Sequence, residues 1–300
     1  MSPETTSVTG GRTTPPRERV ADALRRRIRS GELRPGARLP TQQDLEHEFG
    51  VKRTVVRQAL GILQEEGLVT MGRGAPATVS APAVPGPGAE GPRPAGVLLV
   101  DRVRAALTAE HVTLDVFSMT AETLHSALSA AMPQITSGSL SPSSVSVRVL
   151  LPSPEARLAF PRVVSGAGDP AGTDPALERA HGKVRLYATT LRDQVHALRD
   201  LGLVPEVSVD IRTVPITPVH KLYLLNGRES LIGYYQLVEH SVEFGQEEVD
   251  IYDSFGFRTK LFRSSSGPDR RDDQDAAFVD ESLLWFESLW STLARPFTLD

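Results

Sequence analysis

The stretch TQQDLEHEFGVKRTVVRQALGILQEEGLV, residues 41–69, contains two apolar patterns of helical spacing on either side of a glycine. Thr41 and Asp44 stand three residues apart at its start, which is the spacing of the capping box that begins a helix. Gly50 suits the left-handed position at which such a helix ends. The side chains expected to face inward are Leu45, Phe49, Val56, Leu60 and Leu63. Two short helices joined by a tight turn are therefore predicted.

Basic and polar side chains gather where the second of these helices begins. Lys52 precedes it, and Arg53 and Arg57 are spaced one helical turn apart with Thr54 between them. The N-terminal residues of a recognition helix reach base edges in the major groove. Arginine suits that position, because its planar fork can donate two hydrogen bonds to one guanine. The pattern predicts a DNA-contacting helix.

The flanking segments extend this pattern on both sides. Residues 14–29 carry apolar side chains every four residues between several arginines, which predicts an amphipathic helix. Residues 68–80, LVTMGRGAPATVS, read as two short strands joined by a glycine-flanked tip. Arg73 stands at that tip, where a guanidinium can enter a minor groove. The whole order predicts an α+β winged-helix domain.

Residues 14–79 resemble the GntR family of bacterial winged-helix repressors. The resemblance rests on SGELRPGARLP at residues 30–40, DLEHEFGVKRTVVRQALGILQEEGLV at residues 44–69 and the glycine-rich wing after them. It implies that Arg53, Thr54 and Arg57 make the main base and phosphate contacts. It implies supporting contacts from Gln43, Lys52, Arg73 and Gly74.

Three places depart from that family pattern. Thr41-Gln42-Gln43 replaces a Ser-Glu-Arg-like triplet, Lys52 occupies a position where Ser or Thr is common, and GRGAP replaces a G-x-G-T-F wing. The lost cap hydroxyl costs on the order of 1 kcal/mol, which the attraction of lysine to phosphate could offset on DNA. These departures affect the expected operator sequence, not the expectation of DNA binding.

The charge is distributed unevenly along the 300 residues. Residues 1–80 contain 13 Lys and Arg against 9 Asp and Glu, whereas residues 81–300 contain 20 against 28. Such a basic head on an acidic body is typical of a chain whose head alone meets a polyanion, although a chance split would look the same. No cysteine is present, which excludes disulfides and thiolate-bound metals. We find no signal peptide and no apolar run of spanning length, so a cytoplasmic protein without a membrane partner is expected.

Composition divides the chain into four parts. Residues 81–96 contain five prolines and four glycines and predict a linker. The other expected parts are a disordered N-terminus at 1–13, a winged-helix DNA-binding domain at 14–80 and an α/β effector-binding and dimerisation domain at 97–300.

Strands alternate with helices in the C-terminal part, which predicts an α/β fold with a mixed sheet flanked by helices. Strands are expected at 111–118, 144–152, 206–215 and in three segments between 220 and 256, and helices from 120, over 184–201 and over 276–294. In the last helix, Phe278, Leu283, Phe286, Trp290 and Leu293 are expected to face the core. Residues 165–175 and 264–275 are expected to be loops.

The segment VHKLYLLNGRESLIGYY, residues 219–235, resembles one half of a phospholipase D-like domain. When the segment is aligned on Lys221, Val219 stands at the histidine position and Asn226 at the aspartate position. That chemistry needs a histidine nucleophile, so we expect no enzyme activity. A degenerate domain of this kind also resembles the effector domain of TrmB-like regulators, while the UTRA-type domain of GntR proteins is the alternative.

Several polar residues stand on or at the ends of predicted strands and could line a ligand cleft, namely Asp115, Ser118, Arg148, Arg212, Lys221, Asn226 and Asp253. Arg148, Arg212 and Lys221 are the candidates for contacts to an anionic ligand, with Asn226 beside them. Ordinary surface ion pairs are the competing interpretation of the charged ones. The seven histidines show no metal-binding spacing, and we expect neither a metal nor a cofactor.

The sequence predicts a homodimeric, sequence-specific DNA-binding regulator that responds to a small-molecule effector. The alternatives are a structural DNA-binding protein without a ligand and a DNA-tethered phospholipase D-like enzyme.

Overall fold

The computed structural model describes residues 16–29, 32–34, 36–65, 68–70, 77–79, 91–164, 174–244, 247–266 and 273–298. The chain divides into two compact units, residues 1–89 and residues 90–300. The segment expected to be disordered (1–13), most of the expected linker, and Arg73 and Gly74 lie outside the described residues.

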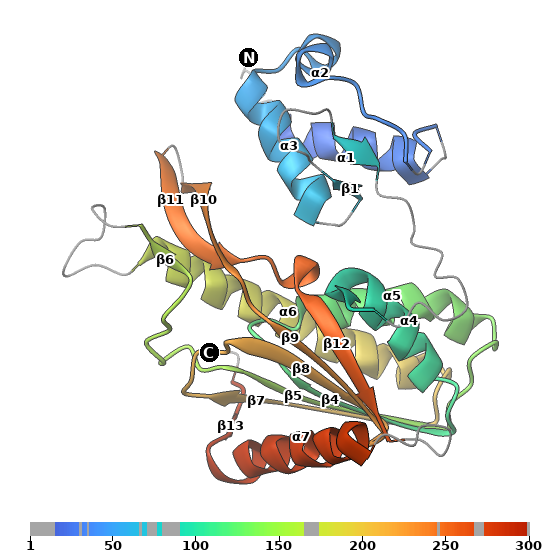
Figure 1. Cartoon of the computed structure of the whole chain (residues 1–300). Coiled ribbons are helices and arrows are strands. Elements are labelled where there is room, and N and C mark those ends of the chain that lie inside the picture. The colour runs from blue at the N-terminus through green and yellow to red at the C-terminus, as the bar shows by residue number, and fades with distance from the viewer. Residues whose placement is uncertain are drawn as a thin grey trace, which may run out of the picture. The chain divides into compact units, whose positions relative to one another are not determined.

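The described residues of the first unit form three helices and a small sheet (Figure 1). Its elements are α1 (Pro16–Arg29), α2 (Gln42–Phe49), α3 (Arg53–Glu65), β1 (Val69–Thr70) and β2 (Thr78–Val79). Leu24, Leu45 and Leu63 come from the three helices and are fully buried together. This is the predicted winged-helix arrangement.

Helix α2 begins and ends as its sequence predicts. The Thr41 side chain accepts a hydrogen bond from the backbone N–H of Asp44, and the Asp44 carboxylate accepts one from the backbone N–H of Thr41. The Thr41 hydroxyl also donates to the Asp44 carboxylate at 2.6 Å, and this bond, together with the one from the Thr41 N–H, holds the pKa of Asp44 below its usual value. Gly50 ends the helix at φ 61°, a conformation that costs glycine little.

The sheet of this unit forms around the strands that lead into and out of residues 71–76. β1 pairs antiparallel with β2, and Arg38 pairs with Thr78 on the other side of β2. The backbone N–H of Leu39 donates to Ala77 O and that of Val79 donates to Ala37 O. The segment before α2 therefore fixes the wing strands to the helices.

An eight-stranded mixed sheet forms the centre of the second unit, with strand order β13-β7-β5-β4-β8-β9-β12-β3. β4, β5 and β7 run parallel, and the other neighbouring strands pair antiparallel. The strands are β3 (Arg93–Pro94), β4 (His111–Phe117), β5 (Ser144–Pro152), β7 (Glu206–Val214), β8 (His220–Leu225), β9 (Glu229–Tyr234), β12 (Lys260–Ser265) and β13 (Arg295–Pro296).

Helices cover both faces of this sheet (Figure 1). One face carries α4 (Ala95–Ala106), α5 (Glu122–Thr136) and α6 (Pro175–Asp200), and the other carries α7 (Asp273–Thr292). A smaller sheet joins β10 (Leu237–Phe244), β11 (Glu247–Ser254) and β6 (Arg162–Val163), and the short helix η1 (Gly256–Arg258) follows β11. The predicted α/β arrangement with a mixed sheet and flanking helices is confirmed.

Alternation along the central strands assigns side chains to the two faces. On β4, Leu114 and Val116 join the core under α4, α5 and α6, whereas Phe117 joins the core under α7. On β8, Tyr223 lies in the first core and Leu222 in the second. Lys221 therefore lies on the face of the three helices, and His220 lies on the face of α7 against the Phe117 ring.

The structure corrects several predicted boundaries. Residues 93–96, assigned to the linker from their composition, form β3 and the start of α4. The helix expected over 184–201 begins at Pro175, because the Asp174 side chain caps it by accepting from the N–H of Ala176 at 2.9 Å. Strand β12 was not predicted, and it reaches into the segment expected to be a loop from residue 264.

The inward face predicted for the closing helix is correct only at its middle. Phe286 is fully buried and Trp290 is 7% exposed, but Phe278 is 38% and Leu293 47% exposed. Helical periodicity predicted that all of these side chains share a face. The buried ones pack on the sheet, whereas Phe278 lies in the second turn of the helix and Leu293 directly follows its last residue.

Candidate DNA interface and ligand cavity

The start of α3 presents an exposed group of polar and basic side chains. Lys52, Arg53, Thr54 and Arg57 are all exposed, while Val56 on the opposite side of the helix is fully buried. Within the described part of the chain, none of the three basic side chains forms an ion pair. The first turn of α3 also carries no acidic residue. An N-terminal helix end with free cations is suited to meeting phosphate.

Helix α2 helps to position one of these arginines. The Nε of Arg53 donates a hydrogen bond to the Gln42 Oε1 at 3.2 Å. Gln42 is the first residue of α2, directly after the Thr41 cap, and its neighbour Gln43 is exposed. The bond leaves the two terminal nitrogens of Arg53 available for a partner. Sequence reasoning missed Gln42, since the bond spans two helices.

Two arginines of α1, Arg25 and Arg27, differ from those of α3. Arg25 pairs with Asp22, and Arg27 pairs with Glu48 and lies over the Phe49 ring. Glu48 raises the pKa of Arg27 by its hydrogen bond and its charge. These arginines are therefore held by carboxylates of their own unit, which favours α3 as the DNA-facing element.

Arg38 is a further exposed cation beside the wing. It lies on the segment that pairs with β2 and was not among the predicted contacts. Arg73 and Gly74, predicted for the wing tip, are outside the described residues. Arg38 pairs with Thr78 of β2, the strand that follows residues 71–76.

The four predicted ligand contacts of the second unit lie in three separate places. Arg148 and Arg212 are on the α7 face, Lys221 is on the opposite face, and Asn226 is in the turn between β8 and β9. The structure therefore does not bring the four together into one site.

Arg148 and Arg212 are occupied by carboxylates and aromatic rings. Arg148 donates to both oxygens of Asp115 at 2.7 and 2.9 Å and to Glu287 at 2.8 Å. These carboxylates raise the pKa of Arg148. Arg212 donates to Asp210 and lies 4.1 Å from the centre of the Trp290 ring. Neither guanidinium is arranged to receive a ligand.

Asn226 stabilises a turn. It has a left-handed φ of 54°, its amide donates to Ala106 O at 3.0 Å, and its Oδ1 accepts from Thr113 N at 2.9 Å. Asparagine tolerates this conformation better than most residues. The part that Asn226 plays in this turn explains why asparagine stands there, and no ligand is needed for that explanation.

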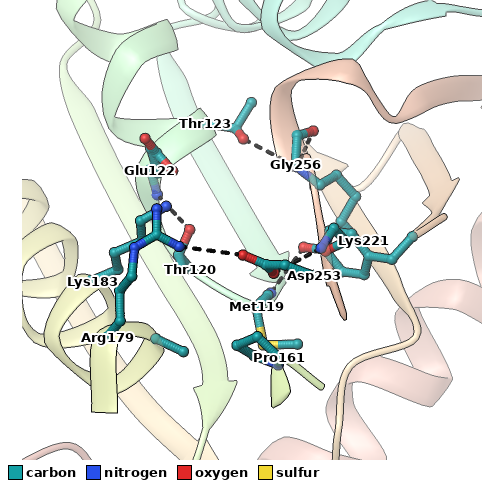
Figure 2. A pocket seen from close by; sticks show the side chains of 13 residues that line it. Met119, Thr120, Glu122, Thr123, Pro161, Arg179, Lys183, Lys221, Asp253 and Gly256 are labelled. Atoms are coloured by element: carbon teal, nitrogen blue, oxygen red, sulfur yellow. Dashed lines mark hydrogen bonds and ion pairs between the residues drawn. The ribbon is translucent and has the colours of Figure 1, made fainter. Parts of the chain in front are cut away.

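Lys221 is the predicted residue that reaches a cavity (Figure 2). It is 1% exposed, and its Nζ donates to Thr123 Oγ1 at 3.0 Å and to the Gly256 carbonyl at 2.9 Å. The cavity of about 50 Å³ lies beyond the carboxyl end of β4, where Met119 and Thr120 lead into α5. Crevices at the carboxyl ends of parallel strands are the usual ligand sites of α/β sheets.

Charged side chains from two helices and a strand line the same cavity. Arg179 and Lys183 come from α6, Glu122 begins α5, and Asp253 lies on β11 at 3.5 Å from Arg179 (Figure 2). Burial lowers the pKa of Lys221 to about 7, partly offset by the charge of Glu122. Lys221 and Asp253 were among the polar strand residues predicted to line a cleft. No pattern in the sequence pointed to Arg179, Lys183 or Glu122, because the fold brings them together from distant segments.

Among the described residues, no group of three or more histidine, aspartate or glutamate side chains could hold a metal ion. None of the helices in the described ranges has the length and apolar character needed to span a bilayer.

Comparison with known proteins identifies the first unit. Residues 16–79 match the family of bacterial regulatory proteins described as the gntR family. The mannosyl-D-glycerate transport/metabolism system repressor MngR of Escherichia coli K12 is 50% identical over 50 residues, which are 17% of this chain and 21% of that protein. The HTH-type transcriptional repressor NagR of Bacillus subtilis 168 is 38% identical over 63 residues, 21% of this chain and 26% of that protein.

A solved structure of the AraR DNA-binding domain in complex with operator ORX1 is 26% identical and covers 26% of this chain and 93% of that one, with a TM-score of 0.23. The chain thus spans about a quarter or less of the length of the two curated relatives. The matches identify the domain at residues 16–79 and do not show the activity of the whole chain.

Proposed function

Because residues 16–79 are a helix-turn-helix domain of the bacterial gntR family, we propose that the chain is a one-component transcription regulator. Its first unit binds operator DNA in the cytoplasm, and its second unit binds a small-molecule effector that changes this binding. The curated relatives MngR and NagR are both named as repressors, which supports the regulatory part of the proposal.

The observation that carries the proposal is the exposed, unpaired group of Lys52, Arg53 and Arg57 at the start of α3. In a helix-turn-helix domain the N-terminal end of the recognition helix, which is α3 here, enters the major groove. Arg53 and Arg57 read bases there, and Lys52 together with the free N–H groups of the helix end holds a phosphate. Thr54, Gln43 and the wing residues Arg73 and Gly74 add contacts on either side.

A homodimer is the expected binding species. One recognition helix reads too few base pairs to distinguish an operator from a genome of competing sites. Two copies related by a two-fold axis would read two half-sites about one helical turn apart. The operator should therefore be a pseudo-palindrome.

The second unit acts as a sensor and not as an enzyme in this proposal. Val219 stands where phospholipase D-like chemistry needs histidine, and Asn226 is committed to its turn. The effector works by preferring one arrangement of the dimer and so shifts the population that can place both recognition helices on DNA. The phospholipase D-like and the UTRA-like assignments of this unit both stay predictions.

Selection from a random duplex library with the full chain tests the proposal. We expect an enriched sequence with two-fold symmetry that binds more tightly than its scrambled version by about a thousandfold or more. A library that shows no enrichment, together with no shift of any duplex at low salt, would remove the regulator proposal.

A further inference from the structure

We propose that the cavity around Lys221 binds one singly charged anionic group, of the carboxylate type, and that Lys221 takes up a proton as the anion enters. The inference rests on the effector role proposed above and deepens it by naming the ligand chemistry. The groups that would hold the anion are Lys221 on β8, and Arg179 and Lys183 on α6.

The hydrogen bonds of Lys221 leave room for one more partner. A protonated lysine has three N–H donors. Two of them are used by neutral acceptors, Thr123 Oγ1 and the Gly256 carbonyl, and no carboxylate among the described residues pairs with the ammonium. A buried ammonium without an anion is costly, so the empty site favours the neutral amine. An anion in the cavity would supply the missing partner.

The charges around the cavity specify a single negative charge. Arg179 and Asp253 form an ion pair, in which the positive and the negative charge compensate each other. Glu122, which accepts a hydrogen bond from the Tyr187 hydroxyl at 2.9 Å, offsets Lys183. With neutral Lys221 the lining has no net charge, and with protonated Lys221 it has one positive charge. Uptake of one proton therefore accompanies the binding of one monoanion.

Size and backbone geometry agree with a small charged group. A cavity of about 50 Å³ has room for a few water molecules, and hence for a carboxylate, but not for a whole sugar or nucleotide. The N-terminus of the 15-residue helix α5 lies at its edge, and Ala121 at the cap gives no side-chain hydrogen bond. The rest of a larger ligand would extend beyond the lining residues toward solvent.

Proton uptake near neutral pH follows from the environment of Lys221. Burial lowers the pKa of Lys221 to about 7, and the negative charge of Glu122 on α5 partly opposes this shift. The other groups around it are Arg179 and Lys183 on α6 and Asp253 on β11, together with the rings of Tyr223 and Tyr235. Burial raises the pKa of both tyrosines, so they stay neutral in this range. An anion next to Nζ would raise the pKa of Lys221.

The probe is formate, which does not titrate near neutral pH, and the sample is the full chain without DNA. Thermal unfolding in increasing formate, at constant ionic strength, gives an apparent affinity at each pH. We expect the affinity to fall roughly 30-fold from about pH 6 to about pH 8.5, because one proton must be bound with the anion. Equal affinities at both pH values would overturn the inference.

Three variants complete the experiment. Lys221→Met should abolish the pH dependence and leave the weak affinity at both pH values, whereas Lys260→Met, an exposed lysine on β12, should behave as wild type. If Lys221→Met does not fold, Lys183→Met should weaken formate binding at both pH values and keep the 30-fold ratio. Formate binding that Lys221→Met or Lys183→Met leaves unchanged would contradict the site.

The same samples separate this inference from the regulator proposal. If formate does not bind while the full chain still selects an operator, only the anion site is wrong. If formate binds as described while no duplex is selected, the regulator proposal is wrong and the anion site stands.

Discussion

The two units differ in the environment of the basic side chains that have no carboxylate partner: these side chains are exposed in the first unit, and Lys221 is buried in the second. At the start of α3, Lys52, Arg53 and Arg57 are exposed, so water solvates these side chains without a carboxylate partner. On β8, Lys221 is 1% exposed, and burial brings its pKa down to about 7. The first group can attract any polyanion and should respond to salt. The second can respond only to a small anion that fits its cavity, and it should respond to pH.

The largest expected effect comes from the buried lysine. The unfolded chain has Lys221 at its ordinary pKa of 10.5 and the folded chain at about 7, so the unfolded state binds more protons between these values. The free energy of unfolding should therefore rise with pH across this window, by an amount on the order of 5 kcal/mol at most. Below about pH 7 Lys221 is protonated in both the folded and the unfolded state, so the full free-energy cost of burying its ammonium group is present.

Denaturant unfolding of wild type and Lys221→Met from pH 6 to pH 10 measures this contribution. Methionine removes the titrating group at similar volume, so the difference between the two proteins should change with pH in the direction given above. The exposed Lys260→Met is the matched control and should follow wild type. A constant difference between wild type and Lys221→Met would show that the lysine is solvated in the folded protein.

The next effect in size concerns the exposed arginines. Arg53→Ala or Arg57→Ala should each reduce the preference for operator over scrambled duplex by about 1–3 kcal/mol, because a fork of hydrogen bonds to one base is lost. Fluorescence anisotropy on both duplexes measures the preference. Arg157→Ala, an exposed arginine of the second unit, controls for the loss of one positive charge. Full preference in both α3 variants would mean that another element reads the bases.

The same contrast explains which site could be predicted from the sequence. The DNA-contact candidates on α3 lie within six residues, from Lys52 to Arg57, and a helical period is enough to place them on one exposed end. The cavity around Lys221 joins α5, α6, β8 and β11, and no local pattern connects Glu122 with Asp253. The sequence therefore pointed to the strand residues Lys221 and Asp253, but to none of the helix residues of the cavity.

Two of the predicted ligand contacts, Arg148 and Arg212, pair with carboxylates that the sequence could not indicate, for a related reason. Arg148 lies directly opposite Asp115 in the parallel pairing of β5 with β4, and Glu287 reaches it from α7. The sequence could place Arg148 on a strand but not its carboxylates, because strand order and register depend on the whole sheet. The fold class was easier to predict, since it needs only the alternation of strands and helices.

A smaller effect is expected from the residue that positions Arg53. Gln42→Ala removes the acceptor of the Nε hydrogen bond and should weaken operator preference by about 0.5–1.5 kcal/mol. The loss should depend on Arg53, so Gln42→Ala in the Arg53→Ala background should have no further effect on preference. Additive losses in this cycle would show that Gln42 contacts DNA by itself.

The smallest expected effect is at the wing, and it is seen in salt dependence and not in preference. Arg73 stands in the sequence between the paired strands β1 and β2, and the exposed Arg38 pairs with Thr78 of β2. If the Arg73 side chain neutralises one phosphate, Arg73→Ala should reduce the slope of log affinity against log salt by about 0.9. Operator and scrambled duplex should weaken nearly equally, because a phosphate contact carries no sequence information. An unchanged slope would confine the salt-dependent contacts to α3 and its neighbours.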